Sequence, residues 1–128
     1  MCLALITKSY PKPSRDVVKV WKWFSYERIN KRLRLYYAFR GGRVITGKWI
    51  KATEGRICFG DINGLDSYPK GFHGSSSQRG VRKGLHYNYY VLIPVEFRRV
   101  HTKGKERGLS VLVAYEMRVP RNWRKYIK

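Results

Sequence analysis

A histidine between two flexible residues is the first side chain in this sequence that could do chemistry. His73 lies in the run GFHG at 71–74. Flanking glycines allow close backbone approach to a ligand, and an imidazole can act as an acid or a base. The run HGS at 73–75 has the form of half a two-histidine phosphoesterase signature, but neither His86 nor His101 supplies the second half. A histidine that hydrogen-bonds a turn or contacts a phosphate is therefore the favoured interpretation.

Cys2 is a second candidate, because it directly follows Met1. Removal of Met1 would expose an amine that can serve as the base for its own thiol. The alternative is a cysteine at the start of a small apolar strand. A small enzyme using His73 or Cys2 is thus one hypothesis for function. Cys2 and Cys58 do not make a disulfide framework and show no zinc-binding spacing, so we expect no metal and no cofactor.

The acidic residues do not cluster as a metal-dependent nuclease would require. Glu96 and Glu116 fall on neighbouring predicted strands, and each is followed two residues later by an arginine, Arg98 or Arg118. Cross-strand ion pairs explain this spacing better than metal binding. The chain also has no glycine-rich phosphate loop of the P-loop type.

Basic residues give the strongest signal, with 28 lysines and arginines against 8 acids and a net charge of +20. They gather at predicted hairpin ends, in a glycine-rich loop and in the C-terminal tail, where they could follow a phosphate backbone. The candidate backbone-binding residues are Arg40, Arg43, Lys48, Lys51, Arg79, Arg82, Lys83, Arg98, Arg99, Lys103, Lys105, Arg107, Arg121, Arg124 and Lys125. The candidate base-stacking residues are Trp21, Trp23, Tyr36, Trp49 and Trp123.

The elements that must position these side chains belong to one domain, 1–128, with 43% hydrophobic and 15% aromatic residues. That composition excludes a disordered basic tail. The apolar start is too short for a signal peptide or a membrane span, so we expect no membrane partner and a reducing cytoplasm. Residues 1–15 are predicted to form a strand or arm, and residues 120–128 a basic tail.

Alternating apolar residues predict strands over 16–24, 33–39, 44–50, 56–59, 87–97 and 109–119. Gly41-Gly42 is expected to join 33–39 to 44–50 as a hairpin, and residues 101–108 to join the last two strands. Residues 25–32 are a helical turn or a hairpin connection, 60–71 a loop, and 73–84 a mobile segment. Pro94 predicts a bulge or a local sheet edge.

These patterns predict a mostly-β fold, with α+β as the alternative: an antiparallel sheet or partly open small barrel of about five to seven strands. At most one or two short helices are expected.

Several runs also resemble a group of small uncharacterised phage-encoded proteins. They are MCL at the start, VVKVWKWF at 17–24, GKWIKA at 47–52, YPKGFHG at 68–74 and VLVAYEMRVP at 111–120. In that group a GFH motif precedes a loop or short helix, and a strand of the VAxEM type closes the chain. Here the segment after GFH is SSSQRGVRKG, which departs from the apolar helix of the group. The resemblance implies a phage origin and a small β-rich fold, but no activity.

The leading functional hypothesis is a non-enzymatic protein that binds DNA or RNA largely without sequence preference. The sequence lacks a helix-turn-helix, zinc-finger or RNP signature that would read bases. An acidic protein surface would attract the same charge. The second hypothesis is therefore a phage inhibitor or accessory subunit that docks on a host protein or a ribonucleoprotein complex, in the host cytoplasm.

Overall fold

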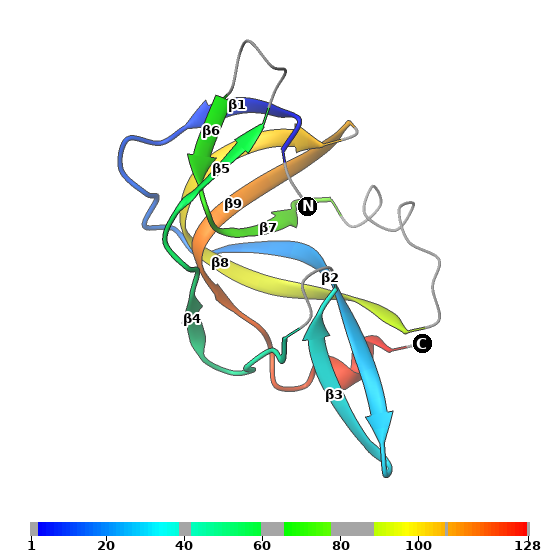
Figure 1. Cartoon of the computed structure of the whole chain (residues 1–128). Coiled ribbons are helices and arrows are strands. Elements are labelled where there is room, and N and C mark those ends of the chain that lie inside the picture. The colour runs from blue at the N-terminus through cyan, green and yellow to red at the C-terminus, as the bar shows by residue number, and fades with distance from the viewer. Residues whose placement is uncertain (1–2, 39–41, 60–65, 78–88, 107, 128) are drawn as a thin grey trace.

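The computed structural model describes residues 3–38, 42–59, 66–77, 89–106 and 108–127. They form a mostly-β fold of antiparallel strands (Figure 1), which confirms the predicted fold class. The strands in chain order are β1 (Leu5–Ser9), β2 (Val18–Ile29), β3 (Arg32–Tyr37), β4 (Trp49–Lys51), β5 (Arg56–Phe59), β6 (Asp66–Pro69), β7 (Phe72–Ser75), β8 (Tyr90–Glu106) and β9 (Leu109–Arg118). A short 3-10 helix, Trp123–Tyr126, follows β9.

Four of these strands close a ring. β8 pairs with β2 and with β9, and β7 pairs with both β2 and β9. β1 extends the sheet at β8, β3 at β2 and β4 at β9, whereas β5 and β6 form a separate hairpin. The ring closes unevenly: β2 pairs with β8 from Val18 to Ser25, but with β7 only at Trp21↔Ser75. The fold is therefore a small, partly open barrel.

The core fills the inside of this ring, as the period-2 alternation of the strands requires. Val20 and Phe24 of β2 are fully buried, while Lys19, Trp21 and Trp23, which alternate with them, are partly or fully exposed. The main buried cluster also includes Val91, Ile93, Val95, Phe97, Ala114 and Met117. A second, smaller buried cluster consists of Leu3, Tyr68, Val111 and Val113.

The predicted hairpin of the last two strands is confirmed, but its turn is shorter than the predicted 101–108, because β8 continues to Glu106 and pairs there with Leu109. Thr102 and Gly104 face inward and are buried, and the lysines between and after them are exposed. Gly104 is a strand residue here: a Cβ atom would collide with the Leu5 carbonyl of β1. The glycine that indicated a turn instead allows β1 to approach β8.

The predicted hairpin of 33–39 with 44–50 is correct only for the residues next to its turn. β3 meets the returning chain only at the bridge Tyr36↔Arg43, and β4 pairs with Glu116–Arg118 of β9 instead. Residues 25–29 continue β2, and Asn30 and Lys31 form a two-residue turn with φ of 49° and 68°. This matches the positive φ pair of a type I′ hairpin without its usual glycine.

Residues 60–71 are not a loop throughout, because β6 occupies Asp66–Pro69. β7 likewise begins the segment predicted to be mobile, with Gly74 packed against Val20 and Phe97 where a Cβ would not fit. Residues 60–65 and 78–84 lie outside the described part. Pro94 agrees with a local edge, since pairing of β8 with β9 begins at Glu96.

The C-terminal segment packs on the sheet: Trp123 is buried in the core, with Tyr126 and Ile127 against it. Among the described residues, no helix has the length and apolarity needed to cross a bilayer.

Candidate nucleic-acid interface

A pocket lies where the ring is open, between β2, the ends of β3 and β4, and the start of β7. We call it the lysine pocket, because lysines from three segments line it. Its volume is about 260 Å³. The lining consists of Lys22, Trp23, Tyr37, Ala38, Lys51, Ala52, Thr53, Lys70, Gly71, Phe72 and His73. None of these residues is acidic, so the lining as a whole is positively charged.

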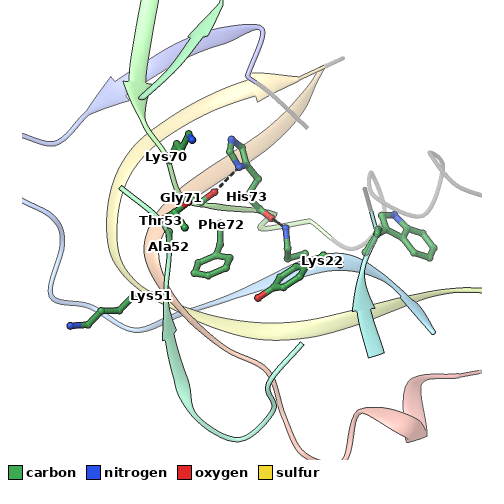
Figure 2. Close-up of a pocket in the computed structure, with 11 residues that line it drawn as sticks. Lys22, Lys51, Ala52, Thr53, Lys70, Gly71, Phe72 and His73 are labelled. Atoms are coloured by element: carbon green, nitrogen blue, oxygen red, sulfur yellow. Dashed lines mark hydrogen bonds between the residues drawn. The ribbon is translucent and has the colours of Figure 1, made fainter. Parts of the chain in front are cut away.

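Figure 2 shows Lys22 reaching into this pocket, where its ammonium group donates to the His73 carbonyl at 2.8 Å. Lys51 and Lys70 lie at the rim, on either side of Ala52 and Thr53. Lys22 has this place because it alternates with Val20 and Phe24 on the inner face of β2. The inward Lys22 side chain has room because β2 and β7 diverge beyond Trp21↔Ser75, the one residue pair that joins them among the described residues.

Aromatic rings form one wall of the lysine pocket. Tyr37 and Phe72 lie nearly parallel, with an interplanar angle of 17° and centroids 6.4 Å apart, and Phe24 packs behind Tyr37. Burial raises the pKa of Tyr37, so its hydroxyl keeps its proton and can donate a hydrogen bond. The pocket therefore combines cations, flat apolar surface and a hydroxyl donor.

A second hollow adjoins the lysine pocket and shares Lys51, Ala52, Thr53 and Lys70 as lining. Arg56 and Arg99 contribute further positive charge to it, together with the ring of Tyr115. Glu54 and Glu116 also line this hollow. The two hollows are thus parts of one surface that crosses the segment after β4.

His73, the leading catalytic candidate, is only 5% exposed and belongs to a buried hydrogen-bond chain. Its Nδ1 lies 3.1 Å from the Gly71 carbonyl, which can only accept, so Nδ1 carries the proton. Nε2 then accepts from the Tyr68 hydroxyl at 2.9 Å, and that hydroxyl oxygen accepts from the Leu3 amide. This geometry gives His73 a role in joining β6, β7 and the N-terminal segment.

His101 is a buried histidine that the sequence patterns did not single out. Its Nδ1 contacts the Thr102 hydroxyl at 2.7 Å, and its ring packs on Tyr115. Burial lowers the pKa of His101 to about 4, the Lys70 backbone opposes this shift, and the charge of Arg56 adds to it. The imidazole is therefore neutral at pH 7.

A second group of cations and aromatics lies across β4, β8 and β9. We call it the Trp49 cluster: Trp49, Arg98, Arg118, Glu96 and Glu116. The guanidinium carbons of Arg98 and Arg118 lie 4.2 and 4.8 Å from the centroid of the Trp49 ring. Arg118 pairs with Glu96 at 2.7 Å and Arg98 with Glu116 at 2.9 Å, which confirms the predicted cross-strand ion pairs.

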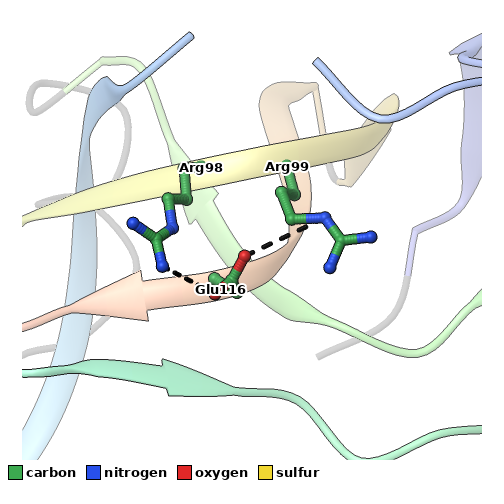
Figure 3. A network of polar contacts seen from close by, with 3 residues as sticks. All are labelled: Arg98, Arg99 and Glu116. Atoms are coloured by element: carbon green, nitrogen blue, oxygen red, sulfur yellow. Dashed lines mark hydrogen bonds and ion pairs between the residues drawn. The ribbon is translucent and has the colours of Figure 1, made fainter. Parts of the chain in front are cut away.

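Glu116 is the buried centre of this cluster, with a side chain 6% exposed. The hydrogen bond from Arg98 lowers the pKa of Glu116, burial opposes it, and the charges of Arg98, Arg99 and Lys51 add to it. Figure 3 shows the consecutive residues Arg98 and Arg99 of β8 approaching Glu116 of β9 from two sides. Arg99 has a left-handed backbone conformation, with φ of 57°, at the point where two consecutive arginines both approach Glu116. The carboxylate thus neutralises much of the local charge.

Other predicted contact residues lie apart from both groups. Lys103 lies near the ring of Tyr10, as does Lys8, which was not predicted, and Trp21 lies under the ammonium group of Lys19. Further predicted contact residues that are exposed on the described surface are Arg43, Lys48, Lys105, Arg121, Arg124 and Lys125. Arg40, Arg79, Arg82, Lys83, Arg107 and Cys2 lie outside the described residues.

Four of the five predicted stacking residues are half-buried at the surface: Trp21, Trp23, Tyr36 and Trp49. Trp123 is only 3% exposed, so its ring serves the core rather than a ligand. The patterns missed Lys22, Lys70, Tyr37 and Phe72. A lysine among the inward residues of β2 was the one local signal that could have found the lysine pocket.

Within the described part of the chain, no group of three histidine, cysteine or acidic side chains could hold a metal ion. Cys58 is an exposed free thiol. Comparison with known proteins finds no matching family model, no similar curated protein and no similar solved structure. The resemblance to phage proteins therefore stays a prediction.

Proposed function

We propose that this protein binds single-stranded nucleic acid, largely without sequence preference and without a catalytic step. One observation carries the proposal: 28 lysines and arginines face only 8 acidic residues, so most of the positive charge exceeds what the chain's own carboxylates can neutralise. Among the described residues, Glu96 and Glu116 are already paired with Arg98, Arg99 and Arg118. A polyanion would relieve the mutual repulsion of the remaining cations.

The aromatic side chains favour an unpaired strand over a duplex. Tyr37 and Phe72 lie beside Lys22, and Tyr10 lies between Lys8 and Lys103. Flat rings next to cations can stack on exposed bases while the cations contact phosphates, and every base offers a face for such stacking. Paired bases inside a duplex do not present these faces.

Fluorescence anisotropy with a labelled single-stranded 20-mer, as DNA and as RNA, tests the proposal between 50 and 200 mM salt. We expect the logarithm of the association constant to fall with the logarithm of salt at a slope steeper than about −3. A duplex of the same length should bind more weakly. Affinity that stays constant over this salt range would contradict the proposal.

A pull-down with and without nuclease separates this function from docking on a protein. For a nucleic-acid binder, we expect nuclease treatment to release the captured material. A single host protein that stays bound after nuclease treatment, and binds directly when purified, would instead support the role of an inhibitor or accessory subunit.

A further inference from the structure

We infer that the lysine pocket receives one nucleotide that carries a terminal phosphate, at the end of a single strand. The inference rests on the proposed function and makes it more specific. The pocket lies at the opening of the ring and has a volume of about 260 Å³. Sites for small molecules usually have about 300–1,000 Å³. The lysine pocket thus has room for a single unit.

The charge of the lining selects an anion. Lys22, Lys51 and Lys70 come from β2, β4 and the residue after β6, and none of the described residues that line the same space is acidic. A terminal phosphate carries up to two negative charges near neutral pH, whereas an internal phosphodiester carries one. The ammonium group of Lys22 lies in the site, and Lys51 and Lys70 add positive charge at its rim, which together favour the terminal group.

The aromatic wall and its hydroxyl suit a base attached to that phosphate. The nearly parallel rings of Tyr37 and Phe72 offer a flat surface of the kind on which bases stack. The Tyr37 hydroxyl stays protonated because burial raises its pKa, so it can donate to a base carbonyl or a phosphate oxygen. An inorganic phosphate would leave this wall unused.

The neighbouring hollow gives the rest of the strand a path. It shares four residues with the lysine pocket, from Lys51 to Thr53 and Lys70, and places Arg56 beyond them. Glu54 and Glu116 also line this hollow, and Glu116 pairs with Arg99, so a strand whose last nucleotide fills the pocket can lay its next phosphate beside Arg56. This continuity favours a strand end over a free nucleotide.

Anisotropy titrations with single-stranded 10-mers that end in a 5′-phosphate, a 3′-phosphate or hydroxyls at both ends test the inference. AMP, adenosine and inorganic phosphate serve as competitors. We expect one phosphorylated end to bind about tenfold more tightly than the hydroxyl ends, a preference worth about 1.4 kcal/mol. AMP should compete better than adenosine or phosphate.

Two pocket variants and one control complete the experiment. Lys22→Gln and Phe72→Leu should each reduce the preference for a phosphorylated end to less than about threefold while binding of the hydroxyl-ended strand persists. The control Glu96→Gln/Arg118→Gln removes an ion pair outside the pocket, keeps the net charge, and should leave the preference unchanged. If either pocket variant fails to fold, Lys70→Gln at the rim replaces it and should likewise reduce the preference for a phosphorylated end.

The outcomes for the pocket and for the general function are distinct. Equal affinity for all three ends, with salt-dependent binding intact, would overturn the inference and leave the proposed function standing. A preference that survives the pocket variants would also overturn it, because another site must then read the phosphate. Loss of every form of strand binding would overturn both. AMP binding without any end preference would show a free-nucleotide site instead of a strand-end site.

Discussion

The Trp49 cluster and the lysine pocket contain the same kinds of residue but differ in role: the cluster stabilises the sheet, and the pocket is a candidate binding site. Both place cations beside aromatic rings, but Glu96 and Glu116 pair with the arginines of the cluster. The described residues that line the lysine pocket include no carboxylate. A cation whose charge is already paired within the fold stabilises the sheet and has little to offer a phosphate. The position of the few acids, more than that of the many bases, thus separates a structural contact from a candidate binding site.

Acid unfolding gives the largest expected effect on stability. Among the described residues, the two buried groups whose pKa values are lowered are His101, near the lysine pocket, and Glu116, in the Trp49 cluster. Burial lowers the pKa of His101 to about 4 from an ordinary 6.5, so the unfolded chain binds the proton first. Stability should therefore rise with pH between about 4 and 6.5, by up to about 3 kcal/mol. The pKa of Glu116 is also lowered, but its contribution is lost only below its ordinary value of 4.5.

Urea unfolding at a series of pH values separates these two windows. We expect the wild-type free energy of unfolding to fall already from pH 6.5 downwards. His101→Gln should remove that part of the slope and leave the loss below pH 4.5. If the unfolding free energy of the wild type stays constant down to pH 4.5, protonation of His101 does not contribute to acid unfolding.

Glu116→Gln tests whether the Trp49 cluster is structural. The substitution removes the charge of a carboxylate that is only 6% exposed and accepts a hydrogen bond from Arg98, and we expect a loss of about 2 kcal/mol in unfolding free energy. Glu96→Gln is the matched control, because the Arg118–Glu96 pair is about 40% exposed on both sides and should contribute below about 1 kcal/mol. Equal losses at the two positions, measured by urea denaturation at pH 7, would mean that burial does not distinguish the pairs.

Neutralising the rim of the lysine pocket should affect binding more than stability. For Lys51→Gln/Lys70→Gln we expect about tenfold weaker binding of a single strand and a salt slope that is shallower by about 1 to 2. Glu96→Gln/Arg118→Gln also replaces two charged residues but keeps the net charge, and should change affinity less than about twofold. Anisotropy at two salt concentrations measures both. If the two double variants weaken binding equally, paired and unpaired cations contribute alike and the comparison fails.

The same contrast explains what the sequence could and could not predict. The ion pairs of Glu96 and Glu116 were predictable, because two alternating strands in a hairpin bring them together locally. The lysine pocket was not, since Lys22, Lys51 and Lys70 meet only through the long-range pairing of β2 with β7 and of β4 with β9.

The alternation of apolar and polar residues predicted the fold class correctly. Glycine positions, in contrast, were a poor guide to where several strands end. Gly104 and Gly74 indicated a turn and a mobile segment, yet both allow close packing inside strands. Trp123 was misplaced for a similar reason. Its basic neighbours indicate an exposed tail, but one face of the 3-10 helix packs on the core. Contacts between distant segments decide such cases, and local composition does not contain them.

Tryptophan fluorescence gives the smallest effect and the most direct view of which ring meets the ligand. Trp23 lines the lysine pocket, whereas Trp49 has two guanidinium groups within 4.8 Å of its centroid. We expect a single strand to quench the emission of the wild type, because bases stack near Trp23. Trp23→Phe should lose most of this quenching, with less than about 1 kcal/mol change in affinity, since other rings of the pocket remain. Trp49→Phe should retain the quenching. The reverse result, with the signal lost at Trp49, would place the strand on the ion-paired sheet face and reverse the roles of the two regions.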